Sequence, residues 1–157
     1  MIPRGKQSEE FYSHGCDYTR TTGIWQTVWA EFVPASYIKS FRLYPYSVNG
    51  CLAIDAVLEG FGNFKAVAYY EGREVGSFEK KAGGTVNGEI KLSETHLWEV
   101  GCGRLYDLEL TFGDDKIKSY FGLRNVKLDD YKFLINGKSV FQRLVLDQGF
   151  YSDGIYT

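Results

Sequence analysis

The polar residues best placed for chemistry are Asp147 and Gln148, which directly follow a mostly apolar run over residues 140–146. The run predicts a buried strand, and ligands often bind where such strands end. These two side chains are therefore candidates for contact with a substrate. The alternative is local, because an aspartate at this place also caps a turn such as the one that Gly149 would make.

Other charged residues favour structural roles. Arg143 lies inside the apolar run, where an unpaired charge would be costly to bury, so we expect it to have a structural ion-pair partner. Adjacent acidic residues lie in turn-like or terminal positions, which favours solvated surface charges over a catalytic pair. These pairs are Glu9-Glu10, Asp114-Asp115 and Asp129-Asp130.

The three cysteines are Cys16, Cys51 and Cys102, and none belongs to a C-x-x-C pair. Cys51 and Cys102 are spaced like the intersheet disulfide of an immunoglobulin domain, but Trp98 does not follow the first cysteine as the tryptophan of such domains does. We therefore expect free thiols and a cytoplasmic location. His14 and Cys16 lack further ligands at a metal-binding spacing, so we expect no metal and no cofactor.

The composition is that of a folded β-protein. The chain has 157 residues, of which 44% are hydrophobic and 17% aromatic, and it has 18 Gly but only 3 Pro. Aromatic residues and glycines in these proportions favour strands and tight turns over helices. The net charge of −2 offers no electrostatic attraction to nucleic acid or to an anionic membrane, so we expect neither partner.

Hydrophobic residues alternate with polar residues along most of the sequence, and the alternating segments end at Gly, Asn and Asp. The pattern predicts one strand over 24–33, bounded by Pro34, and a hairpin around Asn136-Gly137 that continues into the apolar run. Between these flanks it predicts seven short strands, at 36–47, 51–61, 64–72, 73–81, 84–93, 104–112 and 115–123.

Seven short alternating strands predict an all-β domain, specifically an antiparallel β-sandwich of immunoglobulin type over residues 36–124. Tyr106 stands at the head of the sixth strand. It either forms a tyrosine corner, with its hydroxyl bonded to the preceding loop, or is a half-buried strand residue. The flanks, 1–35 and 125–157, have too few strands to close a core alone.

Several segments resemble glycoside hydrolase family 2, which contains β-galactosidases, β-glucuronidases and β-mannosidases. "YTRTTGIWQTVWAE" resembles the last strand of that family's N-terminal jelly-roll domain, and "HLWEVGCGRLYDLELTF" and "SYFGLR" resemble stretches of its immunoglobulin-like domain. "KFLINGKSVFQRLVLDQGFYSDGIYT" resembles the start of its catalytic (β/α)8 barrel. The motifs occur in the family's order; the sequence departs from the family pattern at Gly101-Cys102-Gly103 and at Ser152, both in turns.

The resemblance implies a central piece of a longer enzyme: a jelly-roll tail over 1–35, the sandwich over 36–124 and a truncated barrel start over 125–157. It also implies retaining hydrolysis by two glutamates about 5–5.5 Å apart, supplied by later barrel strands, one of them within an Asn-Glu pair. No Asn-Glu pair occurs in this sequence, so we expect no catalytic residue here and no hydrolysis. Asp147 and Gln148 would touch sugar hydroxyls only in the intact enzyme.

A second hypothesis is a free-standing carbohydrate-binding or adhesive sandwich, because exposed aromatic rings can stack on sugars. The barrel-like C-terminal segment argues against it, since such a module does not need that segment. In either case, flanking strands that lack their sheets are expected to seek partners, which favours a homo-oligomer. The aromatic candidates for sugar contact are Trp25, Trp29, Trp98, Tyr69 and Tyr70.

Overall fold

The computed structural model describes residues 6–19, 23–24 and 26–146, and all regular structure in this part of the chain is β-strand. The all-β prediction is therefore confirmed. All eight strands lie in one compact unit, Phe32–Gln142. A second unit combines residues from the two ends of the chain, Met1–Glu31 and Arg143–Thr157.

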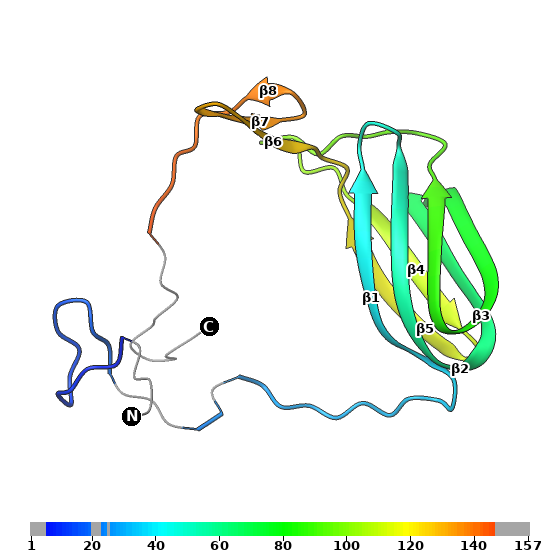
Figure 1. Ribbon diagram of the computed structural model, residues 1–157, viewed down its shortest axis with the longest axis horizontal. Coiled ribbons are helices and arrows are strands. Elements are labelled where there is room, and N and C mark those ends of the chain that lie inside the picture. Colours follow the sequence, from blue (N-terminus) through cyan, green and yellow to red (C-terminus); the bar gives the residue numbers. More distant parts are fainter. Residues whose placement is uncertain (1–5, 20–22, 25, 147–157) are drawn as a thin grey trace. The chain divides into compact units, whose positions relative to one another are not determined.

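The sandwich is made of the first five strands (Figure 1). They are antiparallel, and β2 pairs with β1, β3 and β4, while β4 also pairs with β5. Their bounds are β1 Tyr37–Tyr46, β2 Cys51–Tyr70, β3 Arg73–Lys91, β4 Tyr106–Phe112 and β5 Asp115–Phe121.

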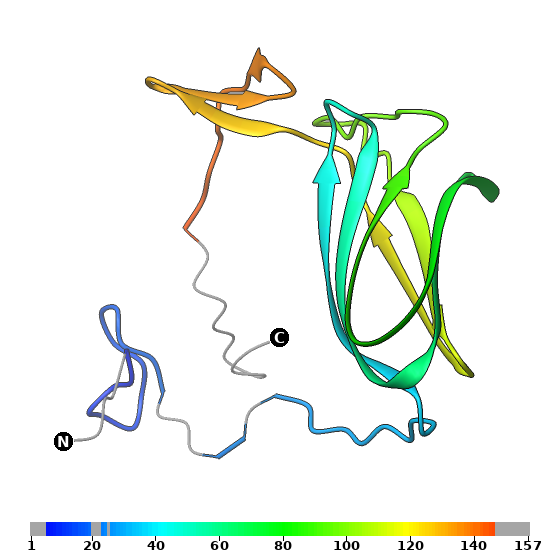
Figure 2. The same cartoon turned by 45° about the vertical axis from the view of Figure 1, so that its right-hand side comes forward.

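Two long strands pass from one layer of the sandwich to the other (Figures 1 and 2). The first half of β2, Cys51–Glu59, pairs with β1, and its second half, Phe64–Tyr69, pairs with β4. β3 follows β2 through both halves, so each layer contains a half of each long strand. This arrangement is the expected immunoglobulin-like sandwich.

The predicted boundaries within β2 and β3 are wrong, because the structure joins four of the seven expected strands into these two. The register between β2 and β3 shifts between Leu58 and Phe61, beside Gly60, which has a φ of 92°, and Gly84, which has a φ of 72°. Glycine adopts such angles without a steric penalty, and strands change sheets through bends of this kind. The strand boundaries expected beside these glycines are therefore bends within continuous strands.

The core consists of the inward-facing residues of both layers, as the alternation predicted. Tyr106, Leu108, Leu110 and Phe112 of β4 are buried, whereas Asp107 between them is exposed. The other members of the core include Leu52, Ile54, Ala56, Leu58, Phe64, Ala66, Ala68, Val75, Val86, Ile90, Leu92, Phe121 and Leu123.

A small meander follows the sandwich, formed by β6 (Val126–Asp129), β7 (Lys132–Ile135) and β8 (Lys138–Ser139). The predicted hairpin around Asn136-Gly137 is confirmed: Ile135 pairs with Lys138, and both turn residues have positive φ angles, 50° and 77°. This is the type I′ pattern.

The Asn136 side chain attaches the meander to the sandwich. Its Nδ2 donates a hydrogen bond to the carbonyl of Trp98 at 2.9 Å, and its Oδ1 accepts one from the backbone N–H of Asn125 at 3.0 Å. Lys138 adds an exposed ion pair with Glu99 at 3.1 Å. The meander is therefore fixed to the loop that carries Trp98.

The two outer strands predicted from the alternation are not formed in the described residues. Residues 26–34 and 140–146 belong to no strand, and most of their apolar side chains are exposed. A β-strand needs a neighbour to satisfy its backbone N–H and C=O groups. Arg143 is exposed rather than buried with a partner, so the expectation of a buried ion pair is wrong.

The unit formed from the chain ends contains a short looped segment near the N-terminus. Backbone hydrogen bonds join Ser8 to Tyr18 and Tyr18 to Lys6, at 2.6 and 2.7 Å. The Ser8 hydroxyl is buried and lies 2.9 Å from Nδ1 of His14. The contact between Ser8 and His14 therefore belongs to the hydrogen bonding of this loop, and it does not indicate a catalytic pair. Across the described residues, no helix is long and apolar enough to cross a membrane.

Candidate binding pocket at Trp98 and Arg124

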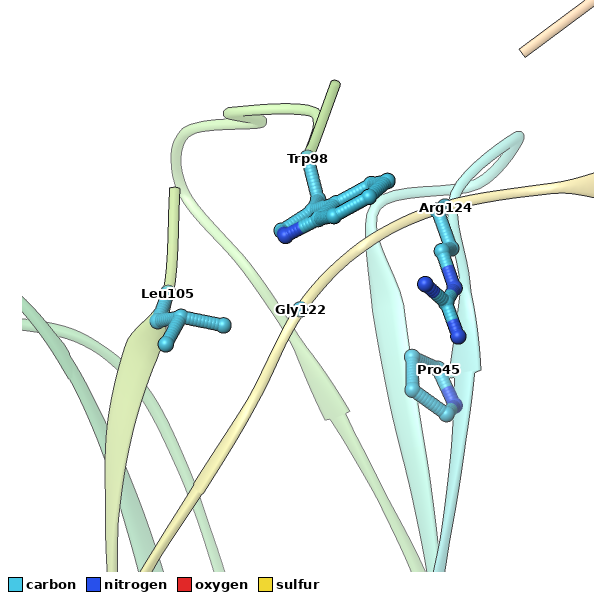
Figure 3. A pocket seen from close by; sticks show the side chains of 5 residues that line it. All are labelled: Pro45, Trp98, Leu105, Gly122 and Arg124. Carbon is cyan, nitrogen blue, oxygen red and sulfur yellow. The ribbon is translucent and has the colours of Figure 1, made fainter. Parts of the chain in front are cut away.

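A pocket of about 390 Å³ opens where the loop between β3 and β4 meets the chain that leaves β5 (Figure 3). Trp98 belongs to the loop, and Leu105 directly precedes β4. Gly122 and Arg124 directly follow β5, while Pro45 lies near the end of β1. Three separate parts of the sequence therefore converge on the pocket.

Backbone hydrogen bonds fix these parts to one another. The N–H of Trp98 donates to the carbonyl of Leu123 at 2.8 Å, and Leu123 is fully buried in the core. The guanidinium of Arg104 adds a side-chain hydrogen bond, donated to the carbonyl of Leu97 at 3.1 Å. Trp98 is therefore held beside the segment that carries Gly122 and Arg124.

Gly122 keeps the pocket open. A Cβ atom at this position would lie 3.3 Å from Cδ2 of Leu105 and 3.5 Å from Cβ of Trp98. Any side chain here would therefore enter the space between the two apolar walls. A larger residue would crowd Leu105 through close approach and not through backbone conformation, since the φ of Gly122 is not among the positive ones.

Arg124 supplies the charge of the pocket. Its guanidinium carbon lies 5.0 Å from the centroid of the Trp98 ring, within the range of a cation–π interaction. Among the described residues no carboxylate pairs with this guanidinium, although three other cations, Arg73, Lys116 and Lys138, have carboxylate partners. The pocket thus combines apolar walls with an uncompensated positive charge.

A second cluster surrounds Tyr106 and stabilises the same loop. The Tyr106 hydroxyl donates to the carbonyl of Glu94 at 3.1 Å and accepts from the backbone N–H of His96 at 2.6 Å. Tyr106 is fully buried, so the tyrosine-corner interpretation is confirmed and the half-buried alternative is wrong. Burial raises the pKa of the Tyr106 phenol, which keeps the hydroxyl protonated and available as a donor.

Glu94 and His96 form a polar pair at the edge of this cluster. Oε2 of Glu94 lies 2.8 Å from Nε2 of His96, and the His96 ring stacks on Tyr70 with 3.9 Å between centroids. The hydrogen bond from His96, with a smaller contribution from Arg73, lowers the pKa of the Glu94 carboxyl. A carboxylate held ionised in this way suits an ion pair rather than a general acid.

The remaining predicted site residues are dispersed. Asp147, Gln148 and Trp25 lie outside the described residues. Trp29 is 73% exposed and lines no described pocket. Tyr70 stacks on His96 and lines none of the described pockets, whereas Trp98 and Tyr69 each line one.

Tyr69 lines a second pocket, of about 360 Å³, together with Asp107, Glu109 and Lys118. Lys116 pairs with Glu109 at 2.8 Å, so part of the charge at this pocket is neutralised. The second pocket carries the carboxylates of Asp107 and Glu109 beside Lys118, whereas no carboxylate is among the described residues that line the Trp98 pocket. The Trp98 pocket is therefore the stronger candidate for an anionic ligand.

Sequence reasoning singled out Trp98 but missed Arg124, Gly122 and Pro45. The signal was present for two of them, because "SYFGLR" contains Gly122 and Arg124. Their relation to Trp98 depends on the pairing of Leu97 with Leu123, which joins segments that are distant in sequence.

The acidic pairs behave as surface groups with one exception. Asp114, Asp129 and Asp130 are exposed, as are Glu9 and Glu10. Asp115 is half-buried and accepts a hydrogen bond from the backbone N–H of Ile38 at 2.8 Å, which is a structural role. No group of three or more potential metal ligands exists within the described residues.

All three cysteines are free thiols, as expected. The alternative, a disulfide between Cys51 and Cys102, is not formed. Cys51 is buried, and this burial raises the pKa of its thiol, which disfavours the reactive thiolate. Cys16 and Cys102 are exposed.

This chain is similar in structure to known proteins, although comparison of its sequence finds no match. No protein-family profile matches the sequence, and no curated protein matches it. A β-glucuronidase from Faecalibacterium prausnitzii matches with a TM-score of 0.61 and 29% identity, over 69% of this chain and 18% of that chain. A β-glucuronidase from Ruminococcus gnavus, in complex with D-glucaro-d-lactam, matches with a TM-score of 0.58 and 21% identity, over 69% of this chain and 19% of that one. The chain thus spans less than a fifth of the length of either enzyme, and the matched 69% of it has the fold of a part of both.

Proposed function

We propose that this chain is a non-catalytic β-sandwich segment of a retaining family 2 glycoside hydrolase of the β-glucuronidase type. The observation that carries the proposal is the match to the F. prausnitzii enzyme, at 29% identity over 69% of this chain. The sequence motifs support it independently, because they follow the order of that family along most of the chain.

In this proposal the sandwich connects two other domains. Residues 1–35 would complete a preceding jelly-roll, and residues 125–157 would begin a following barrel. The exposed apolar side chains at 26–34 and 140–146 support this role, because such residues normally pack against further protein. Asp147 and Gln148 would then contact the sugar in the longer enzyme.

The chain by itself is expected to show no turnover of aryl β-D-glucuronides or aryl β-D-galactosides. Retaining hydrolysis needs two carboxyl groups about 5–5.5 Å apart, and the acidic residues described above are exposed or used in structural contacts. The measurement is release of the chromogenic aryl group by purified protein. Hydrolysis that persists after repeated purification, and that tracks the protein peak, would contradict the assignment.

A reading of the encoding gene provides the complementary test. The proposal requires that the open reading frame continue beyond Thr157 into a (β/α)8 barrel containing an Asn-Glu pair. A stop codon directly after Thr157 would favour the alternative of a free-standing carbohydrate-binding module. The Trp98 pocket is the specific observation in favour of that alternative.

Self-association is expected for the isolated chain. Phe32 and Phe141 are 102% and 86% exposed, and their neighbours include further exposed apolar side chains. Burying such surfaces between copies removes them from water, and strand exchange would also satisfy unpaired backbone groups. Light scattering over a concentration series should show a mass that rises with concentration.

The double variant Phe32→Ser, Phe141→Ser should weaken this association, whereas Tyr44→Ser, on β1 of the sandwich, should not. A strictly monomeric wild-type chain at all concentrations would exclude the homo-oligomer.

A further inference from the structure

We propose that the Trp98 pocket is a binding site for a uronic acid, that is, a pyranose sugar that carries a carboxylate. The described residues that line the site are Pro45, Trp98, Leu105, Gly122 and Arg124. The proposal therefore concerns binding without hydrolysis, and it does not depend on the function proposed above.

The walls of the pocket suit the C–H face of a sugar ring. Trp98 is half-buried, so its indole is held in place by the fold; Arg124 lies over one face of the ring, and part of the remaining surface is accessible. Leu105 and Pro45 extend the apolar surface on the other sides (Figure 3). A rigid aromatic side chain offers contact area at a small cost in conformational entropy.

The two side-chain donors of the pocket, the exposed Arg124 guanidinium and the Trp98 indole N–H, have no hydrogen-bond acceptor among the described residues. No carboxylate among the described residues pairs with the Arg124 guanidinium, and no described residue accepts a hydrogen bond from Nε1 of Trp98. Among the described residues, every buried side-chain nitrogen or oxygen has a hydrogen-bond partner. Nε1 of Trp98 has no partner among these residues, so it is not buried and its N–H reaches solvent. Two free donors, one of them charged, favour a ligand with a carboxylate and further oxygen acceptors.

The size and floor of the pocket favour a single sugar ring. A volume of about 390 Å³ lies at the lower end of the range for small-molecule sites. Gly122 lets the ring approach the backbone between Trp98 and Leu105, where a Cβ would already be in contact with both. Together, an apolar platform, a guanidinium and an open floor are what a uronate requires.

The test is a titration of the full 157-residue chain with sodium D-glucuronate, followed by the indole N–H signals in nuclear magnetic resonance. The Trp98 signal is identified as the one absent from the spectrum of Trp98→Phe. We expect a saturable shift of this signal with D-glucuronate. D-Glucose, which lacks the carboxylate, and acetate, which lacks the ring, should each bind at least about tenfold more weakly.

Two variants distinguish the parts of the site. Arg124→Gln should weaken D-glucuronate binding by about tenfold or more, since a hydrogen bond to a charged group is lost. Gly122→Ala fills the floor without removing any donor and should also weaken binding. Lys39→Gln, which removes one exposed positive charge near the start of β1, should leave the affinity unchanged.

Three results would overturn the proposal: no saturable shift with D-glucuronate, equal binding of acetate, or wild-type affinity in Arg124→Gln. If Arg124→Gln fails to fold, Gly122→Ala and the comparison of D-glucuronate with D-glucose decide the question. Neither of these depends on the catalytic assignment of the longer protein.

Discussion

Replacing Leu108 with alanine is expected to lower the free energy of unfolding by about 2–5 kcal/mol. Leu108 is 1% exposed in the centre of β4 and belongs to the core between the two layers. Truncation removes buried methyl groups and leaves a cavity that the surrounding strands fill only in part. Urea denaturation monitored by tryptophan fluorescence or circular dichroism measures the change.

A matched control uses the same substitution at an exposed leucine. Leu128 is 73% exposed on β6, so Leu128→Ala should change the free energy of unfolding by no more than about 0.5 kcal/mol. Ile54→Ala, on β2 in the facing layer, should resemble Leu108→Ala because Ile54 is equally buried. Similar small losses in all three variants would mean that Leu108 and Ile54 do not lie in a common core.

The second large effect is expected from Tyr106→Phe, which removes only one hydroxyl. The free energy of unfolding should fall by about 1–3 kcal/mol, because the backbone N–H of His96 and the carbonyl of Glu94 lose their shared partner. The ring remains in place, so its stacking on Phe121 is retained. Thermal or urea unfolding of the variant gives the magnitude.

Tyr120→Phe serves as the control, since Tyr120 is 66% exposed and has no described hydrogen bond. It should be close to neutral. If Tyr106→Phe were equally neutral, the tyrosine corner would contribute nothing beyond the burial of its ring. An effect confined to Tyr106→Phe would show that this hydroxyl helps to hold the loop between β3 and β4.

The parts of the fold that depend on neighbouring residues were predictable from the sequence. Alternation placed Ile54 and Leu108 in the core, and Asn136-Gly137 was correctly identified as a hairpin turn, with φ angles of 50° and 77°. Each of these features is decided within a few residues, by the two-residue period of a strand or by the angles that a turn requires.

The features that sequence reasoning missed depend on contacts between distant residues. The strands expected over 51–61 and 84–93 have a boundary beside Gly60 and Gly84, but whether a strand stops or bends there depends on its pairing with the other long strand. The strand expected over 24–33 needs a neighbour to form, and none is present among the described residues.

The candidate pocket was only partly foreseeable for the same reason. Trp98 was considered as a sugar contact, but one sequence cannot show that Arg124 lies over its ring or that Gly122 forms the floor. Both positions depend on the β-bridge between Leu97 and Leu123. The alternation of apolar and polar residues does not reveal that these two segments are neighbours.

The side-chain hydrogen bonds of Asn136 also limit how far the chain that follows the meander can move from the sandwich. If the stretch from Leu123 to Val140 were an unstructured linker, its two ends would be separated by a fluctuating distance of about 20–25 Å. With the stretch folded as a meander and attached to the carbonyl of Trp98, Val140 starts the following chain from a defined position on the sandwich. Any polypeptide that follows therefore meets the sandwich at a higher effective concentration than a flexible tether would allow, and less entropy is lost when the two associate.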